Sequence, residues 1–194
     1  MRLFVALDID QAIRERILRF LQGAQGFAPE ARWVKPESLH VTLKFIGEKP
    51  AEAIEAIKSS LRNLNSEIGE INFRGFGFFP SAKAPRVFWI GIESGPQLKT
   101  LAARVDDALS TLGISKEDHQ FSPHLTLARA GKSGAPQRRP GDAPHSKFKL
   151  LQEKLNAMSP PEFGTATARE FFLYESKLSP AGSKYTKLER FELK

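Results

Sequence analysis

The sequence predicts a compact fold of mixed helices and strands, either one domain or two small lobes that share a core. The chain has 194 residues, enough to enclose a hydrophobic interior, and its 41% of hydrophobic residues is typical of soluble globular proteins. Segments in which apolar and polar residues alternate, as in strands, are followed by segments in which apolar residues recur every three or four positions, as in helices. The motif HVTLKF at 40–45 is echoed by HLTLAR at 124–129, which suggests two similar structural units.

The first half of the chain is expected to alternate strands and helices. Residues 10–24 place apolar side chains at every third or fourth position, as a helix with one buried face requires. Pro50 begins a second helix, because proline is favoured in the first helical turn. The expected strands are short runs rich in β-forming residues, and they cover 2–8, 32–35, 39–46, 71–79 and 86–92.

The second half contains a third helix at 96–112, with one stripe of leucine and valine, and a strand at 125–130. The segment at about 129–149 is basic and rich in glycine, proline and serine, so we expect a long loop, of a length that is usually functional or disordered. The expected elements after it are a short helix near 147–157 and strands at 169–176 and 184–192.

Composition excludes several classes of chemistry. The absence of cysteine excludes disulfides, thiolate metal sites and a cysteine nucleophile, and it fits a reducing compartment. The net charge of +7 favours a polyanionic partner, of which RNA is the natural candidate. Neither a signal peptide nor a membrane-spanning segment is evident, so we expect a cytoplasmic protein without a membrane anchor.

The first motif places a proton-transfer group beside a hydroxyl. Side chains at positions i and i+2 of a strand point to the same face, so His40 and Thr42 share one face. The other face, expected to be buried, holds Val41, Leu43 and Phe45.

The second motif repeats the arrangement. His124 and Thr126 share one face, and Leu125 and Leu127 occupy the other. By the same parity Arg129 points with the leucines, away from the polar face, unless the strand ends or twists there.

This pairing suits phosphoryl chemistry. An imidazole exchanges protons near neutral pH, and a threonine hydroxyl can donate a hydrogen bond to a phosphate oxygen. Hydrolysis of a cyclic phosphodiester needs one group to deprotonate water and another to protonate the departing ribose oxygen. Two such motifs can supply both groups without a metal. We expect no metal site, because the chain lacks HExxH and no carboxylates cluster with either motif. The other two histidines, His119 and His145, are expected at the surface.

Five segments carry a resemblance to a known family. They are RLFVALDI at 2–9, WVKPESLHVTLKFIGE at 33–48, PRVFWIG at 85–91, FSPHLTLAR at 121–129 and LYESKLSPAGSKYTKLERFEL at 173–193. In this order they resemble the 2H phosphoesterase superfamily, specifically its RNA 2′,3′-cyclic phosphodiesterase branch, also called the 2′-5′ RNA ligase or LigT-like family. The resemblance covers nearly the whole chain.

The resemblance implies a structure and a reaction. Residues 1–194 would form one α+β domain of two lobes, with two pseudo-symmetric antiparallel β-sheets backed by helices and facing across a central cleft that holds motifs 40–43 and 124–127. The enzyme would open RNA 3′ ends that carry a 2′,3′-cyclic phosphate to a 2′-phosphomonoester, with His40 as proton donor and His124 as proton acceptor. It would need no cofactor, and some relatives also join RNA ends through a 2′-5′ linkage. We also expect a monomer.

The remaining interpretations stay open at the level of sequence. Thr42 and Thr126 are expected to bind the phosphate, although threonine also favours strands for its own sake. Arg129 is a candidate phosphate or ribose contact. The aromatic run GFGFFP at 75–80 either stacks on the terminal base or belongs to the core, and the basic loop either follows the RNA backbone or is simply solvated.

Two other functions fit some of these observations. A non-catalytic RNA-binding module would explain the charge and the aromatic run but not the duplicated histidines, because phosphate binding alone favours arginine or lysine. A related phosphodiesterase acting on 2′-5′ oligonucleotides or small cyclic nucleotides would use the same two motifs.

Overall fold

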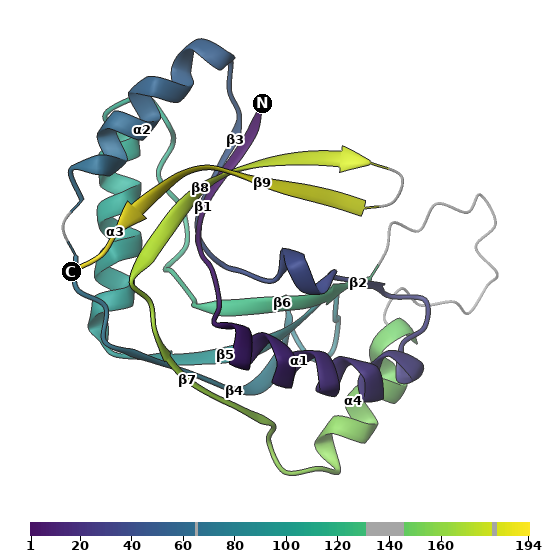
Figure 1. Ribbon diagram of the computed structural model, residues 1–194. Coiled ribbons are helices and arrows are strands. Elements are labelled where there is room, and N and C mark those ends of the chain that lie inside the picture. The colour runs from purple at the N-terminus through teal and green to yellow at the C-terminus, as the bar shows by residue number, and fades with distance from the viewer. Residues whose placement is uncertain (65, 131–145, 180–181) are drawn as a thin grey trace.

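The computed structural model describes residues 1–64, 66–130, 146–179 and 182–194 (Figure 1). Its strands are β1 (Arg2–Leu7), β2 (Arg32–Trp33), β3 (Val41–Glu48), β4 (Glu70–Phe79), β5 (Val87–Ser94), β6 (His124–Arg129), β7 (Glu162–Thr167), β8 (Glu170–Ser179) and β9 (Gly182–Glu192). Its α-helices are α1 (Gln11–Ala24), α2 (Ile54–Arg62), α3 (Pro96–Ser110) and α4 (Lys149–Asn156). Short 3-10 turns adjoin helices at η1 (Gln25–Phe27), η3 (Ala51–Ala53) and η4 (Ser146–Phe148), and a further one, η2 (Pro36–Ser38), lies between β2 and β3.

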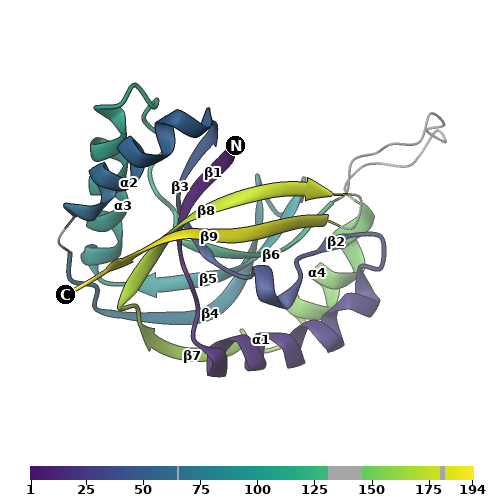
Figure 2. The ribbon, with the colours of Figure 1, turned by 45° about the horizontal axis from the view of Figure 1, so that its top comes forward.

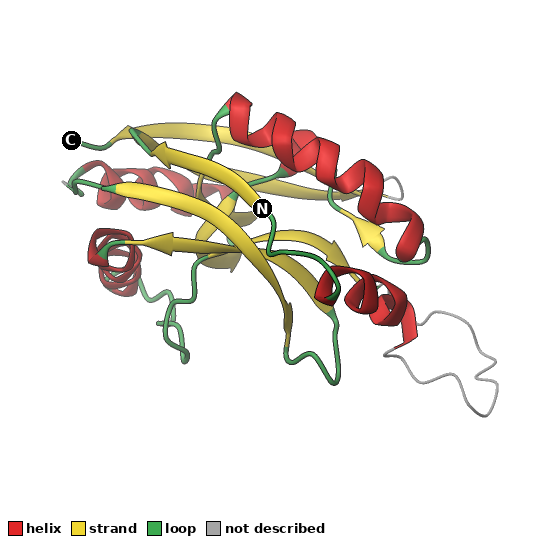
Figure 3. Ribbon diagram, turned by 90° about the horizontal axis from the view of Figure 1, so that it is seen from below, coloured by secondary structure: helices red, strands yellow, loops and turns green. Residues whose placement is uncertain are grey.

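The described strands form two antiparallel sheets. One has the order β3-β1-β8-β9 and the other the order β2-β6-β5-β4-β7. The strands run through the middle of the molecule, with the helices at its periphery (Figure 3). The α+β class with two antiparallel sheets and helices is therefore confirmed.

Each sheet is covered by a helix that follows a strand of the other sheet. Helix α1 follows β1 of the four-stranded sheet but packs against β7 of the five-stranded sheet, where Arg16 donates a hydrogen bond to the Phe163 carbonyl. Helix α3 follows β5 of the five-stranded sheet but packs against β3, with α2 beside it (Figures 1 and 2). Because the helices cross over, apolar residues of both sheets merge into one large core.

Most expected elements lie within a few residues of those observed, with one strand missed. The missed strand is β7, whose sequence EFGTAT contains a single large apolar residue, Phe163, so it lacks the alternation that predicts a strand. Gly164 within it has a positive φ of 110°, which interrupts regular pairing beside β4. The basic loop expected at about 129–149 lies mostly outside the described residues.

Both motifs contain a β-bulge at the same position. Thr42 pairs with Ala6 while Lys44 pairs with Val5, which leaves Leu43 as the extra residue of β3. In β6, Thr126 pairs with Trp89 while Ala128 pairs with Phe88, which leaves Leu127 as the extra residue. The residue after each threonine is therefore the extra residue of a bulge. Beyond it, each side chain points to the opposite face from the one that regular alternation predicts.

Candidate active site

His40 lies immediately before β3 and is held by a hydrogen bond and a set of aromatic rings. Its Nδ1 lies 2.7 Å from the carbonyl oxygen of Ser38, two residues earlier in the chain. The ring packs against Phe4 with a centroid distance of 4.8 Å and against the edge of Tyr185 at 5.2 Å. Backbone and side-chain contacts together therefore fix the position of the imidazole.

His124 opens β6 and is held in the same way. Its Nδ1 lies 2.8 Å from the carbonyl oxygen of Ser122, again two residues earlier. Phe79 at the end of β4 meets the ring in a T-shaped contact with a centroid distance of 4.9 Å, and Trp89 of β5 lies 6.2 Å away. Both histidines thus use one local geometry on two different sheets.

These contacts determine which ring nitrogen is available for chemistry. A backbone carbonyl can only accept a hydrogen bond, so the Nδ1 of each neutral imidazole must carry the proton. The Nε2 of each ring is then an acceptor, and it becomes a donor when the ring is protonated. The matched spacing Ser38-x-His40 and Ser122-x-His124 is visible in the sequence, although the contact uses the serine carbonyl and so does not depend on that side chain.

The two motifs meet in a cleft of about 520 Å³ between the sheets. His40 and Thr42 contribute from one side, and His124 and Thr126 from the other. The described lining includes no carboxylate, and its basic residues are Arg2, Arg32 and Arg129. Such a lining favours an anion.

Arg129 lies in this cleft, so the prediction from parity that it points away from it was wrong. The bulge at Leu127 reverses the alternation, and Arg129 therefore shares a face with Thr126. The matching bulge at Leu43 has the same effect on Phe45, which was expected in the core but is 56% exposed at the cleft. Val41, Leu43 and Leu127 are buried as expected.

Two cleft arginines were not anticipated from the sequence. Arg2 begins β1, and Arg32 pairs with Arg129 across β2 and β6. Their position at the cleft depends on strand pairings that cannot be predicted from the local sequence pattern. In the aromatic run at 75–80, Phe78 is buried in the core, as one of the two interpretations expected, whereas Phe79 packs against His124. Stacking of this run on a terminal base stays a prediction.

Burial in the cleft favours the uncharged form of both imidazoles at neutral pH. Burial lowers the pKa of His40 from its ordinary value of 6.5 to about 4; the hydrogen bond to Ser38 opposes this shift and the charge of Arg129 adds to it. Burial also lowers the pKa of His124, with the same opposition from Ser122 and the same contribution from Arg129. An anion bound beside Arg129 would offset its charge and favour protonation of either ring.

A buried ion pair connects β3, which follows the first histidine, to α3. Lys44 is only 3% exposed, and its Nζ lies 2.6 Å from Oδ1 of Asp106 on α3. The same Nζ donates a 2.7 Å hydrogen bond to the Ser115 carbonyl and lies 3.5 Å from Glu117. Lys44 follows the first motif, and residues 115–117 lead into the second, so this contact ties one motif to the approach of the other.

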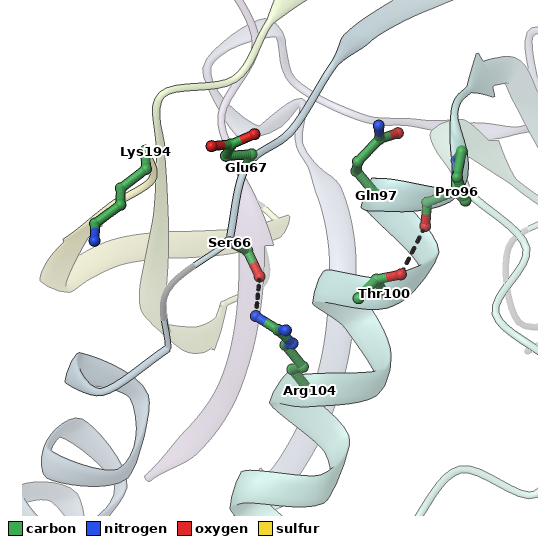
Figure 4. Close-up of a pocket in the computed structure, with 7 residues that line it drawn as sticks. All are labelled: Ser66, Glu67, Pro96, Gln97, Thr100, Arg104 and Lys194. Carbon is green, nitrogen blue, oxygen red and sulfur yellow. Dashed lines mark hydrogen bonds between the residues drawn. The ribbon is translucent and has the colours of Figure 1, made fainter.

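A separate hollow of about 370 Å³ lies beside the start of α3 (Figure 4), and neither His40 nor His124 belongs to its lining. Its lining consists of Ser66, Glu67, Pro96, Gln97, Thr100, Arg104 and Lys194. Arg104 donates a 3.3 Å hydrogen bond to the Ser66 hydroxyl across it. Its lining holds no histidine and neither of the two motifs, so we assign it no chemistry.

Two further features of the described residues bear on possible partners. No group of three or more histidine, aspartate or glutamate side chains in this part of the chain could hold a metal ion. None of the helices described here is long and apolar enough to cross a bilayer. His119 is exposed as expected, and His145 lies outside the described residues.

Comparison with known proteins identifies similar sequences and structures. The family model for LigT like phosphoesterases matches residues 7–89 and 90–185. An RNA 2′,3′-cyclic phosphodiesterase of Archaeoglobus fulgidus is 35% identical over 195 residues, covering 99% of this chain and all of the relative, and one of Thermotoga maritima is 30% identical over 187 residues, covering 95% and 91%. The crystal structure of E. coli LigT complexed with 3′-AMP superposes with a TM-score of 0.76 at 27% identity, covering 99% of this chain and 97% of that one.

Proposed function

Because this chain belongs to the LigT like phosphoesterase family, we propose that it is a hydrolase that opens RNA 2′,3′-cyclic phosphate ends to 2′-phosphomonoesters. Relatives that match almost its full length carry the name RNA 2′,3′-cyclic phosphodiesterase. The observation that carries the proposal is the matched pair of motifs, since each contributes a histidine and a threonine to the lining of one arginine-lined cleft. In both histidines a backbone carbonyl holds Nδ1, which leaves Nε2 for proton transfer.

The reaction is an in-line displacement at phosphorus that needs two proton transfers. The Nε2 of neutral His124 takes a proton from the attacking water, whose oxygen forms a new bond to phosphorus. The bond from phosphorus to the 3′ oxygen breaks, and protonated His40 gives its Nε2 proton to that oxygen. The product keeps the phosphate on the 2′ oxygen. One proton enters and one leaves the enzyme, so exchange with water restores both rings.

The low pKa of His40 fits the role of acid once the substrate is bound. Burial alone favours the neutral ring, but the negative phosphate of a bound substrate raises the pKa of a neighbouring imidazole. The proton donor therefore forms where the substrate needs it. An imidazolium in a buried site is also a strong acid, which favours transfer to the leaving ribose oxygen.

The other polar residues position and neutralise the phosphate. Thr42 and Thr126 lie two residues after each histidine on the cleft face, where their hydroxyls can donate to the non-bridging oxygens. Arg129 supplies a permanent positive charge that acts on both rings and can donate two parallel hydrogen bonds. None of these roles requires a metal ion or an organic cofactor.

The same groups can act with a different nucleophile. If a 5′-hydroxyl of a second RNA takes the place of water, loss of its proton to His124 and cleavage at the 3′ oxygen give a 2′-5′ phosphodiester. We therefore propose 2′-5′ ligation as a side activity. Water is present in large excess over any RNA 5′-hydroxyl, so hydrolysis should dominate over ligation.

A cleavage assay tests this proposal. A short RNA with a 3′-terminal 2′,3′-cyclic phosphate is incubated in EDTA with wild type, His40→Ala, His124→Ala and Arg190→Ala, and the phosphate position in the product is identified. Arg190 is 60% exposed on β9 outside the cleft and serves as the control. Wild type and control should give a 2′-phosphate, and each histidine variant should be slower by about 10²–10⁴-fold. Failure of folded wild type to open this end would refute the assignment.

A further inference from the structure

Helix α1 contacts the turn that leads into the first motif. Nη1 of Arg14, near the start of the helix, donates a hydrogen bond to the carbonyl oxygen of Pro36. Pro36 begins the 3-10 turn η2, and the same carbonyl accepts a 3.3 Å hydrogen bond from the backbone N–H of Leu39. His40 is the next residue. One guanidinium therefore binds the oxygen that closes the turn before the imidazole.

The same turn supplies the acceptor that holds His40. Ser38 is the last residue of η2, and its carbonyl oxygen lies 2.7 Å from Nδ1 of the imidazole. The direction of this carbonyl follows from the backbone of the turn, because planar peptides leave only two free dihedral angles per residue. A bond that fixes Pro36 therefore also limits the direction from which Nδ1 is held.

A carboxylate orients the guanidinium. Asp8 directly follows β1, and its Oδ1 lies 2.7 Å from Nη2 of Arg14 and accepts the backbone N–H of Ile9 at 2.9 Å. Its Oδ2 accepts a 2.7 Å hydrogen bond from Lys187 of β9. Burial alone would raise the pKa of Asp8, but the hydrogen bonds from Lys187 and Ile9 and the two neighbouring positive charges hold it below its ordinary value. The carboxyl group therefore stays ionised and can bind Arg14.

Burial of the guanidinium indicates a role in position and not in substrate contact. The side chain of Arg14 is only 14% exposed, and neither Arg14 nor Asp8 belongs to the described lining of the cleft. A guanidinium so far removed from water is stable only where its N–H groups are bonded, so the bonds to Asp8 and Pro36 favour one arrangement. Arg14 can therefore affect the reaction only through the residues that it holds.

The approach to the second motif is held by a different group. The carbonyl of Ser115 accepts a 2.7 Å hydrogen bond from Lys44, well before His124 in the chain. The bond from Arg14 to Pro36 instead lies on the chain just before His40. Its influence should therefore fall on one histidine and not on both.

We propose that Arg14, oriented by Asp8, is a positioning residue for His40, because it fixes the turn that aims Nε2 of this imidazole at the leaving 3′ oxygen. The inference rests on the proposed function, in which His40 is the proton donor. A displacement of about 1 Å from the productive geometry can slow a reaction by about 10²-fold. Loss of Arg14 should therefore impair protonation of the leaving group, while the threonines and Arg129 still bind the phosphate.

Two substrates separate a loss of proton donation from a general loss of structure. One RNA carries an ordinary 2′,3′-cyclic phosphate, and in the other sulfur replaces the bridging 3′ oxygen, so that the departing thiolate needs no proton. Steady-state rates on both are measured for wild type, Arg14→Gln, Arg14→Lys and Arg16→Gln. Arg16 is the matched control, because it also lies on α1 and donates a hydrogen bond to a backbone carbonyl, that of Phe163 on β7.

Arg14→Gln should lower kcat on the oxygen substrate by about 10–100-fold, with KM on that substrate and kcat on the sulfur substrate within about threefold of wild type. Arg14→Lys keeps the charge beside Asp8 but replaces the planar fork by one ammonium, so it should show the same pattern to a smaller degree. Arg16→Gln should resemble wild type on both substrates. The ratio of the two rates does not depend on the folded fraction, so a partly unfolded variant still gives an answer.

The tautomer of His40 provides a second measurement. In ¹⁵N NMR spectra of wild type at neutral pH the ring should carry its proton on Nδ1, as the contact with Ser38 requires. Arg14→Gln should show a mixture of both tautomers, because the acceptor at Nδ1 is no longer fixed. The Arg16→Gln spectrum should match that of wild type.

Other results would overturn the inference in distinguishable ways. If Arg14→Gln slows both substrates equally or slows neither, or if His40 keeps the Nδ1-protonated tautomer alone in this variant, Arg14 does not position the proton donor and the proposed reaction still stands. If folded wild type opens neither substrate, the proposed function fails and the role of Arg14 fails with it.

Discussion

Acidification should destabilise the fold through His40, and the size of this effect follows from its burial. In the unfolded chain the imidazole titrates near its ordinary pKa of 6.5, whereas burial lowers its pKa in the folded protein to about 4. The unfolded state therefore takes up this proton first as the pH falls. The contribution of neutral His40 to stability is complete above pH 6.5 and is lost between about pH 6.5 and 4.

Linkage converts this shift into a free energy. Relative to high pH, where the imidazole is neutral in both states, a group with these two pKa values reduces the free energy of unfolding by about 2 kcal/mol at pH 5 and by about 0.2 kcal/mol at pH 7. Replacement of His40 by glutamine removes the titration while keeping a neutral polar side chain. Between pH 7 and pH 5 wild type should therefore lose about 1.5–2 kcal/mol more stability than His40→Gln.

Urea unfolding followed by tryptophan fluorescence at the two pH values measures this difference. All other titrating groups are common to both proteins, and the lost contact between His40 and Ser38 affects both pH values equally, so neither contributes to the comparison. If the two proteins lose stability in parallel, within about 0.5 kcal/mol, the imidazole is not buried as described and the account of its protonation is wrong.

Four further substitutions test other parts of the site. Thr42→Ala and Thr126→Ala should each lower kcat/KM for cyclic phosphate opening by about 10–100-fold, because each removes a hydrogen bond to a charged group, and serine at either position should restore most of the rate. Arg129→Gln should raise the KM about tenfold and raise the pKa of both histidines in an NMR titration, whereas Arg190→Gln should change neither. Lys44→Met should lower the free energy of unfolding by roughly 2–4 kcal/mol in a urea titration, because it leaves its carboxylate partners without a counter-charge, and a loss below about 1 kcal/mol would contradict a structural role for this ion pair.

The sequence was sufficient for the parts of the site that depend on local pattern. Alternation within each strand placed His40 beside Thr42 and His124 beside Thr126, and the observed strands keep these pairs on the cleft face. Beyond the threonines, alternation no longer predicts which face a side chain occupies, because the bulges at Leu43 and Leu127 reverse it. The position of Arg129 could therefore not be derived from the strand pattern.

Long-range pairing accounts for the other features that were missed. Strand β7 has little alternation of its own and exists because it pairs with β4. Arg32 reaches the cleft because β2 pairs with β6, and Arg2 because β1 lies beside β3. Helices α1 and α3 each pack against the sheet that does not contain the preceding strand, and this too depends on tertiary packing. None of these contacts can be predicted from residues that are neighbours in the sequence.

The assignment of acid and base is tested most directly by a change of leaving group. In an RNA whose cyclic phosphate has sulfur in place of the bridging 3′ oxygen, the departing thiolate needs no proton. His40→Ala should open this substrate within about tenfold of wild type, although it is slower by about 10²–10⁴-fold on the oxygen substrate. His124→Ala should remain slow on both, because the water must still be deprotonated. Rescue of His124→Ala instead, or of neither variant, would contradict the division of roles between the two histidines.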